Sequence, residues 1–423
     1  YFTATALAML VSEDKIDWDD LMLERLPGFQ VGDALVTSQT TIRDALSHRS
    51  GIEPAHITLS TRTNYTNKQR LGLMKYLKPE KPFRAGFVYN NYMYLAAGEV
   101  IPATTGETWD DYIKNHIFKP LGMKNSATYL GRLANNKNIA IGHEKSGTRL
   151  VPVSHYSTDS GSPSGSIVSS AADMAQWLRF QLNKGKVGNR QLVSEEALME
   201  TRRPHSQFGD LEAKIMLASG LAHNVTAYGL GTGITDSADY KVLTHGGNVS
   251  GMISNNAFIP ELDLGLVVLT NAGIGVALPL TAWIIDRYTG AEETDRVASL
   301  IKVWDEGVED SKSVSVNTLK KHVVKNTRPS LPLSDYVGRY ANDLVGDMKI
   351  SVKGKRLFFE LSGDITGELN HLHFDTFLID ITSPPGLFTR AFNDGVMQFS
   401  LNIDGTIKAL TTGGITYERI VFN

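Results

Sequence analysis

The stretch Phe87-Val88-Tyr89-Asn90-Asn91-Tyr92-Met93-Tyr94-Leu95-Ala96-Ala97-Gly98-Glu99 passes from an aromatic segment into a run of good helix formers. Tyr89 and Asn91 form a Tyr-x-Asn triplet at this junction, where a helix would hold both residues beside a cleft. A phenol there could move protons, and an amide two residues further on could hold a substrate. The triplet alone favours a simpler interpretation, a packed aromatic residue beside a capping asparagine, so its chemistry depends on partners elsewhere in the chain.

Composition limits what this protein can be. Its 423 residues suffice for two or three domains, and 42% hydrophobic with 21% charged residues is typical of a globular protein with a sizeable core. The net charge of −3 provides no basic surface, so we expect no nucleic-acid partner. The sequence contains no run of about 18 apolar residues, so we expect no transmembrane segment. The absence of cysteine excludes disulfides, thiolate catalysis and Cys-ligated zinc.

The order of the predicted elements indicates an α+β fold. Helices come first, including one opened by a capping box at Thr41–Asp44 and one that begins at Ser170. Strands begin near Tyr228, and the apolar run at 264–271 predicts a strand buried on both faces. Short intervals between the strands indicate antiparallel hairpins, and an apolar helix at 280–288 follows. A helical region with one antiparallel sheet is therefore expected, rather than repeated βαβ units.

Three segments divide the chain. Residues 1–292 carry the helices and the sheet, 293–330 predict a helix and a linker, and 331–423 read as strands separated by Gly and Asp turns. The last segment predicts a separate small β-barrel or sandwich. Within the first segment, residues 126–165 are rich in loop formers, and 160–165 form the clearest flexible stretch.

A glycine-rich segment, His245-Gly246-Gly247-Asn248, supplies a second candidate site at the end of a predicted strand. Two glycines let a ligand approach the backbone, and exposed N–H groups here can bind an oxyanion. His245 could carry a proton or donate to a carboxylate, although a hairpin with an incidental histidine fits equally well. His48 ends a predicted helix and is better explained as a capping or packing residue than as a base.

Several segments of residues 1–290 occur in the order of a known family: Phe2-Thr3-Ala4 to Asp20, Thr41 to Gly51, Tyr89-Asn90-Asn91, Pro120-Leu121-Gly122-Met123, Ser170 to Trp177, Tyr228-Gly229-Leu230-Gly231 and His245-Gly246-Gly247. Together they resemble the serine beta-lactamase and penicillin-binding-protein superfamily, specifically its class C beta-lactamase-like hydrolases, esterases and D-amino-acid peptidases. The His-Gly-Gly segment stands where lactamases have K-T-G and many esterase-like members have H-x-G. The C-terminal segment resembles the lipocalin-like barrel appended to some members, through residues 336–340 and 371–377.

The resemblance implies a serine hydrolase that forms an acyl-enzyme and needs no metal and no cofactor. The family's nucleophile lies in a Ser-x-x-Lys motif just before the residues that match Tyr1, so we expect this motif upstream of residue 1 in a truncated chain. Ser12-Glu13-Asp14-Lys15 has the same letters, but its place at the far end of a helix argues against it. The alternative is a chain that is catalytically inactive.

The same resemblance assigns roles to the candidate residues. Tyr89 would share the proton transfers, with a nearby positive charge favouring its phenolate, and Asn91 would hold the substrate or orient the Lys. His245 would lie in the cleft wall, and the backbone of Gly246, Gly247 and Asn248 would bind the substrate and its oxyanion.

The expected substrates are esters, or amides of small or D-configured peptides. His245 lacks the permanent charge of the K-T-G lysine, which argues against beta-lactams with an anchoring carboxylate. A true beta-lactamase, and a non-catalytic binding or scaffold protein with the same fold, stay open as alternatives. By resemblance alone we expect export to the periplasm or the extracellular space, and a homo-oligomer formed through the C-terminal barrel is a further expectation.

Overall fold

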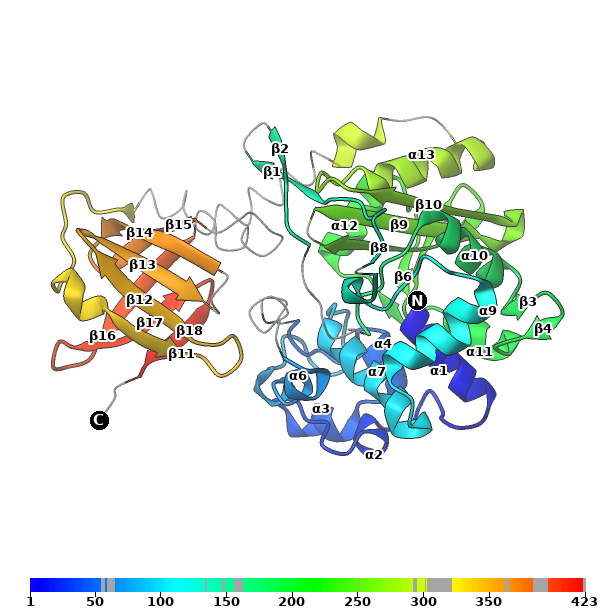
Figure 1. Ribbon diagram of the computed structural model, residues 1–423, viewed down its shortest axis with the longest axis horizontal. Helices are drawn as coiled ribbons and strands as arrows, with labels where there is room; N and C mark the ends of the chain where they lie inside the picture. Colours follow the sequence, from blue (N-terminus) through cyan, green and yellow to red (C-terminus); the bar gives the residue numbers. More distant parts are fainter. Residues whose placement is uncertain are drawn as a thin grey trace. The chain divides into compact units, whose positions relative to one another are not determined.

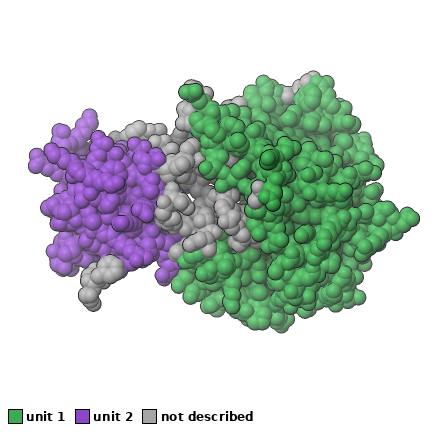
Figure 2. All heavy atoms as spheres, viewed as in Figure 1, with its two compact units in different colours: residues 1–56, 64–303 green, residues 57–63, 304–423 purple. Residues whose placement is uncertain are grey.

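The computed structural model describes residues 1–423 except 55–57, 59–64, 134, 147–148, 156–162, 250, 292–294, 301, 303–321, 362–364, 383–394 and 421–423. The chain forms two compact units, which comprise residues 1–56 with 64–303, and residues 57–63 with 304–423 (Figure 2). The domain boundaries at 292 and 330 stay predictions, because much of the expected helix and linker lies outside the described residues.

Unit 1 combines helices with an antiparallel sheet (Figure 1). Its helices include α1 (Phe2–Ser12), α2 (Met22–Arg25), α3 (Ala34–Gln39), α4 (Ile42–Leu46), α6 (Asn67–Leu71), α7 (Asn91–Thr105), α8 (Trp109–Tyr112), α9 (Lys119–Leu121), α10 (Ala171–Leu182), α11 (Glu195–Glu200), α12 (Asp210–Ser219) and α13 (Ala277–Thr289). A π-helical segment, Ile113–Phe118, joins α8 to α9. Among the described residues, no helix has both the length and the apolar character needed to cross a bilayer.

Local signals in the sequence explain where several helices begin. The Thr41 hydroxyl accepts from the Asp44 N–H while the Asp44 carboxylate accepts from the Thr41 N–H, so the predicted capping box is confirmed. Ser170 caps α10 by accepting from the Asp173 N–H, as expected. Helix α1 is buried on every side from Thr3 to Leu10, which makes it a core helix rather than an amphipathic surface helix.

The central sheet of unit 1 has the strand order β10-β9-β8-β7-β6-β5, and each neighbouring pair is antiparallel. Its strands are β5 (Ser206–Gln207), β6 (Thr226–Tyr228), β7 (Gly233–Ser237), β8 (Tyr240–Val249), β9 (Met252–Ile259) and β10 (Leu264–Thr270). Two short hairpins, β1 (His143–Ser146) with β2 (Arg149–Pro152) and β3 (Lys186–Val187) with β4 (Arg190–Gln191), lie outside this sheet. The α+β class is confirmed.

Helices cover both faces of the sheet, because successive residues of a strand point to opposite faces. Val242 packs in one buried cluster with Ala282 and Ile285 of α13. Its neighbour Leu243 packs in another with Leu178 of α10. Figure 1 shows α13 and α10 on either side of the strands. The sheet is thus held between two helices, and its β8 strand passes through the middle of the core.

The structure corrects five details of the sequence prediction. The run at 264–271 forms β10 at the edge of the sheet, where most of its residues stay partly exposed, because only β9 pairs with it. The predicted loop at 126–165 contains the β1–β2 hairpin, and helix α12 was not predicted. Helix α13 begins two residues before Pro279, which lies third in the helix, where no N–H partner is required.

The fifth correction concerns His245, which lies inside β8 and not at a strand end. Strand β9 supplies a partner for every residue from 245 to 249, so the ladder continues through both glycines. Strand β7 pairs with β8 only as far as Thr244. From His245 onward, β8 therefore pairs with β9 alone.

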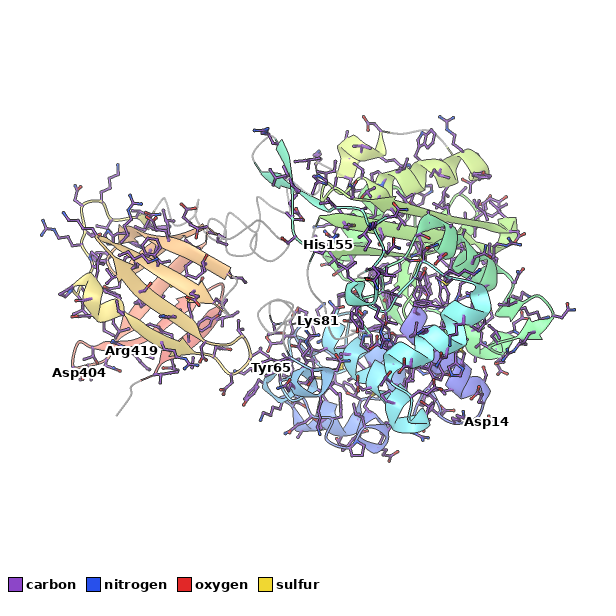
Figure 3. The ribbon with its side chains drawn as sticks, in the orientation of Figure 1. Asp14, Tyr65, Lys81, His155, Asp404 and Arg419 are labelled. Carbon is purple, nitrogen blue, oxygen red and sulfur yellow. The ribbon has the colours of Figure 1, made fainter. Side chains whose placement is uncertain are left out.

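Unit 2 is a closed barrel of consecutive antiparallel strands: β11 (Gly338–Ala341), β12 (Met348–Lys353), β13 (Arg356–Leu361), β14 (Ile365–His373), β15 (Thr376–Ile381), β16 (Val396–Leu401), β17 (Ile407–Thr412) and β18 (Ile415–Arg419). Tyr340 of β11 pairs with Arg419 of β18 and closes the ring. Arg419, labelled in Figure 3, donates from Nη2 to the Val337 carbonyl at 3.1 Å. Tyr336, Phe377 and Phe399 are buried inside with other apolar side chains, so the small all-β barrel expected from the sequence is confirmed.

Candidate active site

Asn90 fixes the start of α7 and so the place of Tyr89. Its Oδ1 accepts from the Tyr92 and Met93 N–H groups at 2.8 and 3.1 Å, which caps the helix. Its Nδ2 donates to the carbonyls of Ile52 and Glu53 at 3.0 and 2.9 Å. The side chain is fully buried. The sequence singled out the two residues on either side of Asn90 and missed this clamp, because its partners lie almost 40 residues away.

His48 packs directly against Tyr89. The two ring centroids are 4.4 Å apart, and the His48 Nδ1 accepts from the Asn90 N–H at 3.1 Å. His48 is buried and adopts a left-handed φ of 57°, which a non-glycine residue keeps only where the surrounding contacts hold it. His48 therefore holds the Tyr-x-Asn segment by packing against Tyr89 and accepting from the Asn90 N–H, in agreement with the packing role that the sequence favoured.

Tyr89 is only half-buried, yet its surroundings raise the pKa of its phenol to about 12 because they desolvate the phenolate. Asn91 is the first residue of α7 and is partly exposed. The described residues thus keep Tyr89 protonated at neutral pH. A lysine ammonium nearby would oppose this effect and lower the pKa.

His245 enters the same region from β8. Its Nε2 lies 3.1 Å from the Tyr228 hydroxyl, and the Tyr228 ring lies 5.0 Å from that of His48. The Tyr94 hydroxyl donates to the Leu46 carbonyl at 2.6 Å and lies 3.5 Å from that of Tyr228. Tyr89 and His245, more than 150 residues apart, therefore belong to one cluster of rings.

The amino end of α1 reaches this cluster as well. The rings of Tyr1 and His245 make an edge contact with centroids 5.8 Å apart. Gly231, with a left-handed φ of 77°, leaves space where a Cβ would lie 3.2 Å from the Tyr1 nitrogen and 3.3 Å from the Tyr94 hydroxyl. Tyr1, the residue that precedes α1, thus lies beside the phenols.

The backbone of β8 beyond His245 is open. Gly246, Gly247 and Asn248 are all exposed, and they pair with Asn255, Ser254 and Ile253 of β9. A Cβ on Gly247 would lie 3.1 Å from the Ser254 hydroxyl. The glycines therefore leave the strand surface bare, which suits a ligand lying against the backbone.

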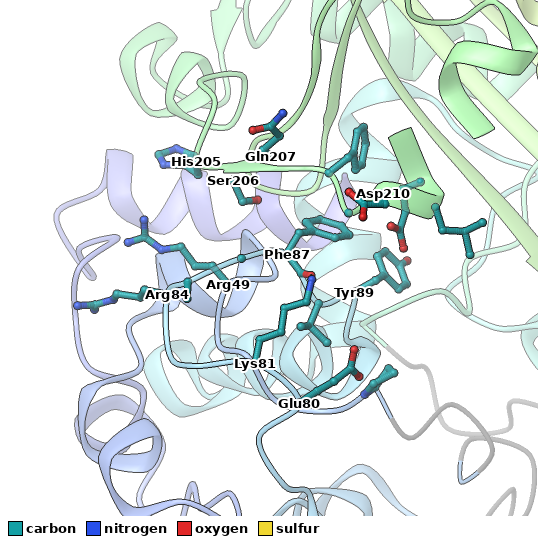
Figure 4. A pocket seen from close by; sticks show the side chains of 18 residues that line it. Arg49, Glu80, Lys81, Arg84, Phe87, Tyr89, His205, Ser206, Gln207 and Asp210 are labelled. Atoms are coloured by element: carbon teal, nitrogen blue, oxygen red, sulfur yellow. The ribbon is translucent and has the colours of Figure 1, made fainter. Parts of the chain in front are cut away.

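A cavity of about 810 Å³ adjoins Tyr89 (Figure 4). The segment from Glu80 to Tyr89 forms one side, and residues 205–212, which lead from β5 into α12, form the other. Lys81 extends along its floor and donates from Nζ to the Phe87 carbonyl at 3.1 Å. The volume suffices for a small peptide or ester.

A buried carboxylate anchors the loop that carries this cavity wall. Asp44 is fully buried, and its Oδ1 accepts from the Arg49 Nε at 2.6 Å while its Oδ2 accepts from the Arg84 Nη2 at 2.7 Å. Burial alone would raise the pKa of Asp44, but hydrogen bonds from Arg84, the Thr41 N–H and Arg49 lower it below its usual value. The sequence identified Asp44 only as a helix cap.

Ser12 has a structural role. Its hydroxyl donates to the Ala8 carbonyl at 2.7 Å and accepts from the Ser194 N–H at 2.9 Å, which ties α1 to the start of α11. Lys15 pairs with Glu13 instead of approaching Ser12. Within the described part of the chain, no group of three or more His, Asp or Glu residues is arranged to hold a metal ion.

Comparison with known proteins agrees with this architecture. Residues 1–288 match the beta-lactamase family, and residues 323–422 match a domain of unknown function, DUF3471. The chain therefore belongs to the beta-lactamase family, within the superfamily of hydrolases that includes the penicillin-binding proteins.

Two relatives illustrate the range of similar sequences. The unguisins hydrolase of Aspergillus violaceofuscus is 27% identical over 388 residues, which cover 82% of this chain and 66% of that protein. Penicillin-binding protein 4 of Amycolatopsis lactamdurans is 28% identical over 282 residues, or 65% of this chain and 71% of that protein. This chain thus spans just under two thirds of the Aspergillus hydrolase.

Solved structures share the fold. The octameric penicillin-binding protein homologue from Pyrococcus abyssi gives a TM-score of 0.56 at 20% identity, covering 98% of this chain and 85% of that one. A D-stereospecific amidohydrolase from Streptomyces sp. gives 0.56 at 24% identity, covering 69% and 84%. The first match extends over both units of the chain, whereas the second covers about two thirds of it.

Proposed function

We propose that this protein is a serine hydrolase that cleaves esters or amides of small or D-configured peptides through an acyl-enzyme. The observation that carries the proposal is the convergence of Tyr89, His245 and the amino end of α1 on one ring cluster beside a cavity. By resemblance to the family, the Ser-x-x-Lys motif stands on residues that precede Tyr1 and enters the site from that helix end.

The proposed chemistry begins with attack of the serine oxygen on the substrate carbonyl, while the lysine amine takes the hydroxyl proton. Tyr89 then donates its phenolic proton to the leaving group, a role that suits a phenol which its surroundings keep protonated. The lysine returns a proton to Tyr89. Water then attacks the ester of the serine, the lysine amine takes a proton from this water and passes it to the departing serine oxygen, and the acid is released. Atoms and charges balance without any further reactant.

Two other groups complete the proposed site. Asn91, in the first turn of α7, holds the substrate or orients the lysine. The open backbone of Gly246, Gly247 and Asn248 contacts the substrate, and the Asn248 N–H donates to the oxyanion together with the N–H of the serine itself. An oxyanion donor stabilises only the charge that develops in the transition state, so it raises kcat.

The substrate class follows from charge and from relatives. An imidazole stands where a lactamase has the lysine of K-T-G, and burial lowers the pKa of His245 below its usual value. A neutral side chain does not anchor a carboxylate as an ammonium does. The name of the Aspergillus relative, an unguisins hydrolase, supports a hydrolytic reaction.

A fluorophosphonate probe tests the proposal on the protein with its native amino terminus. We expect one covalent adduct by intact mass, located by peptide mapping on a serine upstream of Tyr1. Tyr89→Phe should lower short-chain ester hydrolysis about 10²-fold or more while leaving the fold intact. Faster cleavage of cephalosporins than of esters or D-amino-acid amides would overturn the substrate class. Absence of both adduct and turnover would favour the alternative of a binding protein.

Two further proposals concern localisation, which rests on resemblance, and assembly. We infer that the protein is exported, which cell fractionation of the native host tests, since recovery with cytosolic markers only would contradict it. We also infer that copies assemble through the barrel. Light scattering on the full chain and on a chain ending before residue 323 tests this, because an unchanged oligomeric state after truncation would refute a role for the barrel.

A further inference from the structure

The two ring nitrogens of His245 have different partners. The Nδ1 lies 2.7 Å from the Gly246 carbonyl oxygen, and the Nε2 lies 3.1 Å from the Tyr228 hydroxyl. The backbone beside the ring is also held, because Asn256 donates from Nδ2 to the His245 carbonyl at 3.0 Å. The side chain is thus fixed at both nitrogens, and its strand is fixed by β9.

These contacts determine which nitrogen carries the proton. A carbonyl oxygen can only accept, so the hydrogen bond to Gly246 requires a proton on Nδ1. A neutral imidazole has one N–H, so Nε2 is an acceptor and the Tyr228 hydroxyl donates to it. The Tyr94 oxygen could also accept this proton, but it lies 3.5 Å from the Tyr228 hydroxyl, whereas the His245 Nε2 lies at 3.1 Å and is the nearer acceptor.

The surroundings also disfavour a charged imidazolium. Among the described residues, the titratable groups that face His245 are the phenol of Tyr228 on β6 and the phenol of Tyr1, which precedes α1. None of them offers a negative charge, because burial raises the pKa of both phenols above the usual value. Desolvation lowers the pKa of His245.

We propose that Tyr228 is a positioning residue that holds His245 as the uncharged Nδ1–H tautomer. The site thereby selects against substrates that place a carboxylate beside His245. The selectivity part rests on the proposed hydrolase function. Tyr228 touches no reacting atom. It acts through His245 by occupying the nitrogen that would otherwise accept a proton and attract an anion.

Imidazole ¹⁵N NMR tests the tautomer directly and needs no enzymatic activity. The His245 resonances are assigned by their loss in His245→Asn, because the chain has 11 histidines. We expect the wild-type protein to show a protonated Nδ1 and an unprotonated Nε2 that persist to pH 5. In Tyr228→Phe the Nε2 loses its donor, so the pKa of His245 should rise by about one unit.

Tyr94→Phe is the matched control, because it removes a buried hydroxyl of the same cluster that does not bond His245. It should leave the His245 titration within about 0.3 units of the wild type. A protonated Nε2 in the wild type, or an equal shift in both variants, would overturn the role of Tyr228. If Tyr228→Phe does not fold, the wild-type spectrum still decides the tautomer.

Kinetics with an isosteric substrate pair test the selectivity. The esters are p-nitrophenyl butyrate and mono-p-nitrophenyl succinate, of which only the second carries a carboxylate. We expect wild type to prefer the butyrate at every pH, and Tyr228→Phe to reduce this preference about threefold at pH 5, chiefly through KM for the succinate. An unchanged preference would overturn the selectivity. If neither ester nor amide is hydrolysed, the proposed function fails, while the NMR result still decides the tautomer.

Discussion

Replacement of Asn90 offers a quantitative test of how the candidate site is held. Asn90→Ala removes the acceptor that caps α7 and the two donors that satisfy the Ile52 and Glu53 carbonyls. Loss of a helix cap costs about 1 kcal/mol. Each carbonyl left without its donor in a buried setting costs about 1 kcal/mol more. The free energy of unfolding should therefore fall by about 3 kcal/mol.

Thermal unfolding followed by circular dichroism measures this loss. For a unit of roughly 300 residues, 3 kcal/mol corresponds to a fall in Tm of about 5 °C. Asn90→Ser keeps a capping oxygen but lacks the donors, so it should lose about 3 °C. Because Tyr89 precedes the cap, Asn90→Ala should also lower kcat about tenfold or more.

Thr108→Ala is the control, because the Thr108 hydroxyl caps α8 by accepting from the Asp111 N–H and also donates to the Asp111 carboxylate, and both hydrogen bonds are exposed. It should lower Tm by less than about 2 °C and leave ester turnover unchanged. A Tm for Asn90→Ala within about 1 °C of the wild type would refute the reasoning. Equal losses in Asn90→Ala and Asn90→Ser would show that the two donors contribute nothing.

Three further predictions concern residues that hold the site. The lowered pKa of Asp44 means that its stabilisation is present above its unfolded pKa of about 3.9 and is lost as pH falls through the lower folded value. Asp44→Asn should therefore cost about 2 kcal/mol at pH 7 and flatten the dependence of Tm on pH below 4, whereas an unchanged acid limb would contradict it. Gly98→Ala would stabilise an ordinary helix, but here the new Cβ would lie 2.2 Å from the Pro163 Cβ. The free energy of unfolding measured in urea should therefore fall by about 1–3 kcal/mol, and a rise would refute the contact. Gly231→Ala combines a left-handed φ with crowding at the amino end of α1, so it should lower both Tm and probe labelling, and wild-type labelling would exclude a role for this contact.

Local features of the sequence predicted local structure well. Capping signals act over three residues, so the starts of α4 and α10 could be identified from Thr41 and Ser170 alone. The change from helical to strand patterning near Tyr228 gave the α+β class, and alternating residues after 331 gave the barrel. Strand β10 was misplaced because apolar content reports how well a segment packs and not whether it has one neighbouring strand or two.

The sequence by itself determined most of the elements, their order, the family and the residues Tyr89, Asn91 and His245 as candidates. Only the tertiary structure decided how they are held. The register of β8 with β7 and β9, together with the path of β6, brings the Tyr228 hydroxyl to His245, and a buried loop contact brings Ile52 and Glu53 to Asn90. Such pairs depend on chain closure over tens of residues, and no local pattern encodes their partners. The hydrogen-bond geometry of the fold, in contrast, determines even which nitrogen of His245 carries the proton.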